Sequence, residues 1–456
     1  MLTTKEKVLL DRFVQSPFHN QHEGVIRLYQ YLVGQDEVAE PDHSKEAAFA
    51  FVFPDLPYKD LKIRHVMSYL VRVIEEFLIF QEFRANDANA HLHLLRVYGR
   101  RNLPKPFHAT ARKIQKMQSG KAQIGPEDHH INYQVNLEQF NVTEERHQGA
   151  QDVFQRLSDE LDAYYVVNKL KHACIILSHR KLFNVEYQLG LLDDVVRWVE
   201  TYADREIPEV IIFYNCYKLL VEEDTIPFFE ALKALIDQYG DKVESEEMRF
   251  VYTMAINYCI KRINTGQPEF LREVFEMYRK SLVGKVIYDN GKLPPWTYKN
   301  IVSAGLKLEE YDWVEKFNFE YRYEIYEEYQ DSFYYYNLAR LYFARSEYRR
   351  AARILNDLQV KDIFTSLDAR VTLIKAWFEL GEFKLIEYSL NNFSQLLHRR
   401  GILTYHKKNY KNFVRYMNKL INLKPHDGKA KAKFVDSVQS EEILTEKGWI
   451  LSKVES

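Results

Sequence analysis

The sequence is poor in the residues that tight turns, disulfide frameworks and membrane spans require. Its 456 residues include 16 glycines and 13 prolines, roughly half the usual combined share of about 12%. An all-β protein needs many such turn residues, so their scarcity argues against that class. Three cysteines are too few for a disulfide framework. No apolar run reaches the roughly 18 residues of a membrane-spanning helix, so we expect no membrane association.

The start of the chain and its overall composition indicate a folded cytoplasmic protein. The first residues, MLTTKEKVLLDRF, include acids and lack an apolar core, so we expect no secretory signal peptide. Apolar residues make up 46% of the chain and the formal net charge is −2, which is typical of folded rather than disordered proteins. The length exceeds the roughly 250–300 residues that one hydrophobic core organises. We therefore expect several domains or an array of repeats.

Hydrophobic periodicity predicts helices throughout. After Pro57, seven apolar residues recur at helical spacing, namely Ile63, Val66, Met67, Leu70, Ile74, Phe77 and Leu78. Almost all prolines lie between such segments, where they do not interrupt a helix. The sequence therefore predicts an all-α fold, an α-solenoid of stacked helical hairpins with a separate N-terminal helical domain. Gly120, Gly125 and Pro126 mark the expected boundary. The predicted parts are an N-terminal domain at 1–125, a repeat array at 126–423, and a basic linker with a short C-terminal helix at 424–456.

Two segments of the C-terminal half repeat the same order of large, small and aromatic side chains. In residues 334–358 these are Tyr335, Leu338, Ala339, Tyr342, Ser346, Tyr348, Ala351, Leu355 and Leu358. In residues 373–393 they are Leu373, Trp377, Gly381, Phe383, Leu390 and Phe393, with Ile374 and Ile386 where small residues are expected. A weaker copy lies upstream, at Tyr298, Ile301, Tyr311 and Val314.

These residues resemble the tetratricopeptide repeat (TPR), a pair of packed helices, over residues 334–393. The resemblance implies that Ala339 and Ala351 let neighbouring helices approach closely. It also implies a curved stack of helix pairs whose concave surface binds peptides or proteins. We therefore expect a non-enzymatic helical-repeat scaffold that binds another protein, whose identity the sequence does not specify.

Aromatic residues crowd the beginning of this region. Thirteen of them lie between Phe317 and Tyr348. Tyrosine offers a large apolar area with a polar tip, so it suits both the interior of a helical stack and a binding groove. Thirteen such side chains cannot all face the interior of one amphipathic hairpin. We therefore take Tyr323, Tyr326 and Tyr334 as candidates for contact with a partner.

Basic residues gather in two segments despite the near-zero net charge. Eight bases and no acid lie in residues 96–121, and eleven bases with one acid lie in 399–433. The first set is Arg96, Arg100, Arg101, Lys105, Arg112, Lys113, Lys116 and Lys121. The second set is Arg399, Arg400, Lys407, Lys408, Lys411, Arg415, Lys419, Lys424, Lys429, Lys431 and Lys433.

These basic segments support an alternative function, the binding of RNA or DNA. Tyr405, Tyr410, Phe413 and Tyr416 interleave the second segment and could stack on unpaired bases. Two other interpretations remain open. The bases could form solvated helix faces whose aromatic residues are core, or they could pair with the acidic middle of the chain or of a second copy.

Enzymatic motifs are absent from the sequence. It contains no phosphate-binding loop, no G-x-S-x-G and no H-E-x-x-H. Cys174, Cys216 and Cys259 are too far apart for a C-x-x-C site and sit among apolar residues. Arg101, Asn102 and His108 fit a spacing found in some helical ribonucleases, but so short a pattern occurs by chance in a chain of this length. We therefore expect that the protein is not an enzyme and that it has no cofactor and no metal site.

A short apolar group ends the chain. Trp449, Ile450 and Leu451 follow the basic segment HDGKAKAKF, which reads as a flexible linker. We expect these residues to dock either onto the last hairpin or onto a second copy of the chain. The sequence alone does not choose between the two.

Overall fold

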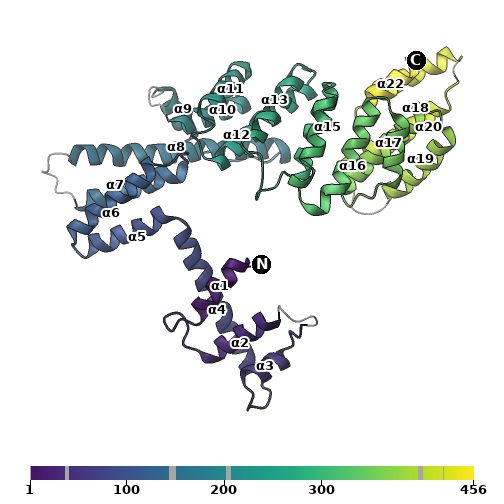
Figure 1. Ribbon diagram of the computed structural model, residues 1–456. Helices are drawn as coiled ribbons and strands as arrows, with labels where there is room; N and C mark the ends of the chain where they lie inside the picture. The colour runs from purple at the N-terminus through teal and green to yellow at the C-terminus, as the bar shows by residue number, and fades with distance from the viewer. Residues whose placement is uncertain are drawn as a thin grey trace. The chain divides into compact units, whose positions relative to one another are not determined.

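The computed structural model describes residues 2–35, 41–142, 150–201, 207–398, 404–424 and 426–455. These residues form 22 α-helices and one short 3₁₀ helix, and no β-strand occurs among them, which confirms the all-α prediction (Figure 1). Helices α1 to α8 span Thr4–Val14, Glu23–Gln35, Lys45–Val52, Asp60–Ala85, Asp87–Arg100, Pro104–Ser119, Pro126–Val142 and Ala150–Phe183. Helices α9 to α15 span Leu192–Thr201, Pro208–Val221, Ile226–Tyr239, Ser245–Asn264, Phe270–Val283, Pro295–Lys307 and Tyr311–Glu320. Helix η1 is Arg322–Glu324, and helices α16 to α22 span Glu327–Ala344, Tyr348–Asp357, Ile363–Glu379, Phe383–His398, Thr404–Ile421, Gly428–Gln439 and Lys447–Glu455.

The chain divides into two compact units. Unit 1 comprises residues 1–172 and 191–195, and unit 2 comprises residues 173–190 and 196–456. The division falls within α8 and α9 rather than at residues 120–126, because α7 packs on α5 and α6. The finer division into 1–125, 126–423 and 424–456 stays a prediction.

Unit 1 contains two separate hydrophobic cores. One joins α1 to α4 and includes Leu10, Leu28, Phe49 and Phe77, all nearly inaccessible to solvent. The other joins α5 to α7 around Phe107. The N-terminal helices therefore have an interior of their own. Helix α1 begins with a capping box, in which Thr3 and Glu6 exchange hydrogen bonds.

Unit 2 is a solenoid-like succession of helix pairs that share one kind of turn. In four hairpins the connecting residue adopts a left-handed conformation, with φ of 90° at Gly266, 60° at Glu309, 61° at Ser346 and 71° at Gly381. After each, a backbone N–H donates to the carbonyl five residues earlier at 2.8–3.1 Å, closing a Schellman turn. The donor–acceptor pairs are Gln267–Arg262, Glu310–Gly305, Glu347–Tyr342 and Glu382–Trp377. Since these turns lie 43, 37 and 35 residues apart, the structure is a helical repeat with an irregular period.

Small residues sit where the helices of these pairs come closest. Ala339 and Ala351 are completely buried, as the repeat pattern predicts. At Gly305 a Cβ atom would lie 2.5 Å from Cγ2 of Val314. Because real Cβ atoms essentially never come so close, any larger residue there would push α14 and α15 apart.

The shared turn predicts opposite effects for two matched substitutions. A non-glycine residue in the left-handed region is strained by its Cβ, and glycine relieves this strain. We expect Ser346→Gly to raise the free energy of unfolding by about 0.5–1 kcal/mol and Gly381→Ser to lower it by a similar amount. Urea denaturation followed by circular dichroism measures both. If both variants changed the free energy of unfolding in the same direction, the result would contradict the shared turn geometry.

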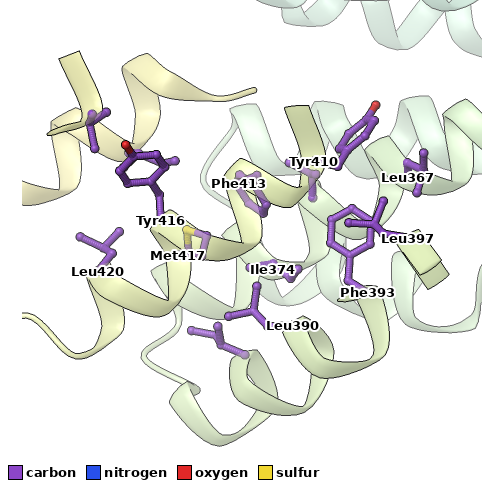
Figure 2. Packing of buried hydrophobic residues seen from close by; sticks show 14 of the residues in the cluster. Leu367, Ile374, Leu390, Phe393, Leu397, Tyr410, Phe413, Tyr416, Met417 and Leu420 are labelled. Atoms are coloured by element: carbon purple, nitrogen blue, oxygen red, sulfur yellow. The ribbon is translucent and has the colours of Figure 1, made fainter. Parts of the chain in front are cut away.

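The last five helices of unit 2 enclose a large hydrophobic cluster. Phe393 from α19 and Phe413 from α20 lie near Ile374 of α18, and all three are fully buried (Figure 2). Helix α22 adds Ile450 and Val454 to this cluster. The C-terminal apolar group therefore docks on its own chain, which resolves the choice that the sequence leaves open.

Polar contacts fix α22 in place. The Trp449 indole N–H donates to Glu379 at 2.9 Å. Lys375, whose side chain is 10% exposed, forms a 2.7 Å ion pair with Glu446. The segment HDGKAKAKF, residues 426–434, is expected as a flexible linker, but most of it belongs to α21, because the Asp427 side chain caps this helix and Phe434 and Val438 are buried.

Candidate functional site

A groove in unit 2 lies between the C-terminal end of α17 and the facing sides of α18 and α19. It has a volume of about 300 Å³ and is among the more enclosed hollows of the described chain. Helix α18 contributes Ser366, Ala369, Arg370, Leu373, Ile374 and Trp377, and α19 contributes Leu385, Tyr388, Ser389 and Asn392. Leu355, Asn356, Leu358 and Val360 complete the wall at the end of α17. Both helical sets follow the i, i+3, i+4, i+7 spacing of a single helix face.

Local sequence features hold α18 and α19 in position. Asp362 caps α18, with its carboxylate accepting a 2.6 Å hydrogen bond from the backbone N–H of Thr365. The Gly381 turn then returns the chain so that α19 packs along α18. Ile386, which does not line the groove, is fully buried in the C-terminal core. The groove face of α19 is thereby left toward solvent.

The groove combines an apolar floor with an exposed aromatic rim. Leu355 is buried, and Leu373 and Trp377 are half-buried. Leu385 is 40% exposed and Tyr388 is 68% exposed, so both present apolar surface to solvent. Apolar side chains at this density mark a surface that can bury the side chains of a ligand.

The polar groups of the groove are amides, hydroxyls and one cation. Arg370 is its only charged lining residue. It is exposed, and within the described residues no acidic side chain forms an ion pair with it. Asn392 and Ser389 lie on the facing helix, and both can donate and accept hydrogen bonds. A ligand in this groove would therefore meet an unneutralised positive charge beside an apolar floor.

Two of the three tyrosines nominated from the sequence, Tyr323 and Tyr334, contact an arginine of the same chain. The Arg322 guanidinium lies 5.3 Å from the Tyr323 ring, 4.6 Å from the Tyr334 ring and 5.7 Å from the Tyr335 ring. Asp331 pairs with the same guanidinium. Tyr323 is 66% exposed and Tyr326 is 38% exposed, whereas Tyr334 is half-buried. Two of the three rings thus already contact an internal cation.

The basic segment 96–121 lies on α5, α6 and the loop that follows, in unit 1. Arg96 is neutralised by Glu138 of α7 at 3.1 Å, and Lys121 pairs with Asp128. Six other bases of the segment are exposed, namely Arg100, Arg101, Lys105, Arg112, Lys113 and Lys116. The segment therefore divides into bases that hold α7 and bases that face solvent.

The second basic segment lies on α20 and α21. Arg399 and Arg400 fall outside the described residues. Lys408, Lys411 and Arg415 are exposed and Lys407 is half-buried. Of the four aromatic residues that could stack on bases, Tyr410, Phe413 and Tyr416 are at most 6% exposed and belong to the hydrophobic core, and the side chain of Tyr405 lies outside the described residues. For these three the interpretation that the aromatic residues are core holds, because their spacing places them on the inner face of α20.

In the part of the chain that the structure covers, no three histidine, cysteine, aspartate or glutamate side chains are placed to hold a metal ion. Burial raises the pKa of the Cys174 and Cys259 thiols to about 12, which keeps them protonated near neutral pH. Asn102 adopts the left-handed conformation, with a φ of 53°, in the turn between α5 and α6. Asparagine tolerates this conformation better than most residues, so the turn accounts for an asparagine at this position.

Sequence reasoning missed the residues that line the groove. Tyr388 and Asn392 lie in the segment that resembles the second repeat but fall between the positions of the repeat pattern, and Arg370 lies three residues before that segment. The signal that could have found them is the helical spacing of Leu385, Tyr388 and Asn392, which places two large apolar groups opposite the buried face of the same helix.

Comparisons with known proteins add no relative. No protein-family model, no curated protein and no solved structure matches the chain. The helical-repeat fold therefore rests on the helix pairs and their turns. Among the helices described, none has both the length and the hydropathy needed to traverse a lipid bilayer.

Proposed function

We propose that the protein is a non-enzymatic helical-repeat scaffold that binds a segment of another protein in the groove between α17, α18 and α19. The observation that carries this proposal is the groove itself, which joins exposed Leu385 and Tyr388 to the unpaired Arg370. Exposed aromatic and arginine side chains around an apolar floor are the groups that dominate binding energy at protein interfaces. The side-chain order of residues 334–393 further supports a TPR-like repeat.

The groove chemistry defines the ligand. An apolar side chain of the ligand would be buried against Leu373 and Trp377, and Tyr388 would cover it from the rim. A carboxylate on the ligand would meet Arg370, whose planar guanidinium binds carboxylates with two parallel hydrogen bonds. The partner is therefore an exposed peptide segment that has an acidic residue or chain end next to large apolar residues.

Selection from a displayed peptide library on the full-length chain tests this proposal. We expect enriched peptides to share a carboxylate next to leucine, phenylalanine or a similar residue. Arg370→Glu should weaken their binding about tenfold or more, because it replaces a charge-assisted pair by repulsion. Tyr388→Ala should weaken it by removing aromatic contact area. Isothermal titration calorimetry measures both effects.

A matched arginine outside the groove provides the control. Arg353 lies on α17, is exposed, and does not line the groove. Arg353→Glu carries the same charge change and should leave the affinity within twofold of the wild type. The proposal fails if selection yields no peptide whose binding depends on Arg370 and Tyr388, or if Arg353→Glu weakens binding as much as Arg370→Glu.

A further inference from the structure

A row of basic side chains follows the outer face of α20 and continues to α21. Its members, which we call the basic row, are Lys408, Lys411, Arg415, Lys419, Lys424 and Lys433. All six are exposed. On α20 they recur at intervals of three or four residues, so they lie along one side of the helix. The distance along the axis from Lys408 to Lys419 is about 16 Å at 1.5 Å per residue.

The row ends at a hollow between α20 and α21. This hollow has a volume of about 540 Å³ and is lined by Lys419, Lys424 and Lys433 together with Asn422 and other residues. One carboxylate, that of Asp427, also lines it, but this carboxylate accepts the 2.9 Å hydrogen bond from Ala430 that caps α21. The lysines therefore dominate the charge of the hollow.

Most of the row has no acidic partner in the described chain. Arg415 is the exception, with an ion pair of 2.6 Å to Glu441. No acidic side chain pairs with the five lysines in the ranges that the structure covers. Residues 404–439 include nine basic residues and only two acidic ones, Asp427 and Asp436. Such a concentration of unneutralised charge fits a polyanionic partner.

The surrounding surface distinguishes a nucleic acid from a protein. Between Lys407 and Val454, none of the described large hydrophobic side chains is exposed. Protein interfaces are depleted in lysine and rely on aromatic and apolar anchors. Nucleic-acid interfaces are more polar and far more positively charged, and most of their hydrogen bonds go to phosphate and sugar. The basic row has this second composition.

The aromatic residues of α20 further decide between single and double strands. A surface that binds single strands presents aromatic rings on which bases stack. Among the α20 rings that the structure describes, those of Tyr410, Phe413 and Tyr416 are buried in the hydrophobic core (Figure 2), while the side chain of Tyr405 lies outside the described residues. Contact through phosphates alone requires no exposed base, and a duplex offers its phosphates in a fixed array.

We propose that the basic row binds the phosphate backbone of double-stranded nucleic acid without regard to base sequence. The five unpaired lysines would each displace a counterion from the duplex. The row is distinct from the peptide groove, so this inference does not rest on the proposed function.

Fluorescence anisotropy of the full-length chain with a labelled DNA duplex of mixed sequence tests the proposal. If all five lysines contact phosphates, the logarithm of the affinity should fall with the logarithm of salt concentration with a slope of about −4.5. The triple variant Lys408→Glu, Lys411→Glu and Lys419→Glu should lose about 100-fold or more in affinity at moderate salt, and its slope should be smaller by about 3. All three side chains are exposed, so circular dichroism should show an intact fold.

Matched controls and competitors separate the alternatives. The triple variant Lys307→Glu, Lys316→Glu and Lys361→Glu makes the same charge change at exposed sites of unit 2 outside the row and should lose less than threefold. The proposal is overturned if both triple variants bind equally, or if the wild-type chain shows no affinity for the duplex at low salt. Tighter binding of single-stranded oligothymidylate would also overturn it. Polyglutamate and unlabelled duplex are compared as competitors for the labelled duplex. If polyglutamate displaces it at the lower concentration, the proposal is overturned, because that result would indicate an acidic protein partner.

Discussion

Replacement of Ile450 by aspartate is expected to detach α22 and to lower the free energy of unfolding of unit 2 by about 4 kcal/mol or more. Ile450 is completely buried in the C-terminal cluster, and aspartate there would place an unpaired charge among apolar side chains. Detachment would also separate Glu446 from Lys375. The ammonium group of Lys375, with 10% of its side chain exposed, would then lack its 2.7 Å partner.

Urea denaturation and hydrogen exchange measure this effect. We expect a lower midpoint of unfolding and faster amide exchange in α18, α20 and α22, three of the five helices that share the cluster. Gly448→Asp is the matched control, because it introduces the same side chain at an exposed position of α22 with no neighbouring atom within 4 Å. An acid in the first turn of a helix should leave stability unchanged or slightly raised. Equal losses in the two variants would contradict the docking of α22.

Alkaline pH is expected to unfold unit 2 in a steep transition. Burial raises the pKa of Tyr252 and Tyr278 to about 12, and it raises the pKa of Tyr298, Tyr336 and Tyr410 still further. In the unfolded chain a tyrosine ionises near pH 10. Between pH 10 and 12 the unfolded state therefore binds fewer protons than the native state. Stability is fully present below pH 10 and falls as pH rises, by about 1.4 kcal/mol per pH unit for each such tyrosine.

Five tyrosines acting together should lower the free energy of unfolding by several kcal/mol per pH unit above pH 10. Urea midpoints measured across this range give the slope directly. Tyr278→Phe removes one ionisable group and should reduce the slope by about 1.4 kcal/mol per pH unit. The tyrosinate absorbance of the five residues should appear only with the loss of helical circular dichroism. Ionisation of these residues in the folded chain would contradict the prediction.

The sequence predicts those parts of the fold that are encoded within one hairpin. The turns at Glu309, Ser346 and Gly381 are each followed by a glutamate and an aromatic residue, so neighbouring residues alone reveal the repeat. The turn at Gly266 is followed by Gln267 and Pro268 and therefore escapes the pattern. The burial of Ala339 and Ala351 also follows from their positions in the pattern.

The candidate sites depend on contacts between residues that are far apart in the chain. The sequence does not reveal such contacts. Arg96 is neutralised by Glu138, which lies 42 residues away on α7. The groove is formed by three helices, and its apolar exposure appears only once their packing is known. For the same reason, counting bases in residues 96–121 overstates the charge available to a partner.

The repeated turn also bears on how such an array changes in length. Each turn is closed by a hydrogen bond between residues five positions apart. The turn therefore does not depend on how many residues the adjoining helices contain. An insertion of three or four residues adds about one helical turn to a rod and restores the direction of its side chains. The spacings of 43, 37 and 35 residues show that the length between turns varies while the turn itself is kept. Evolution can thus lengthen individual helices, and widen the surface that they present, while the turns between them are kept.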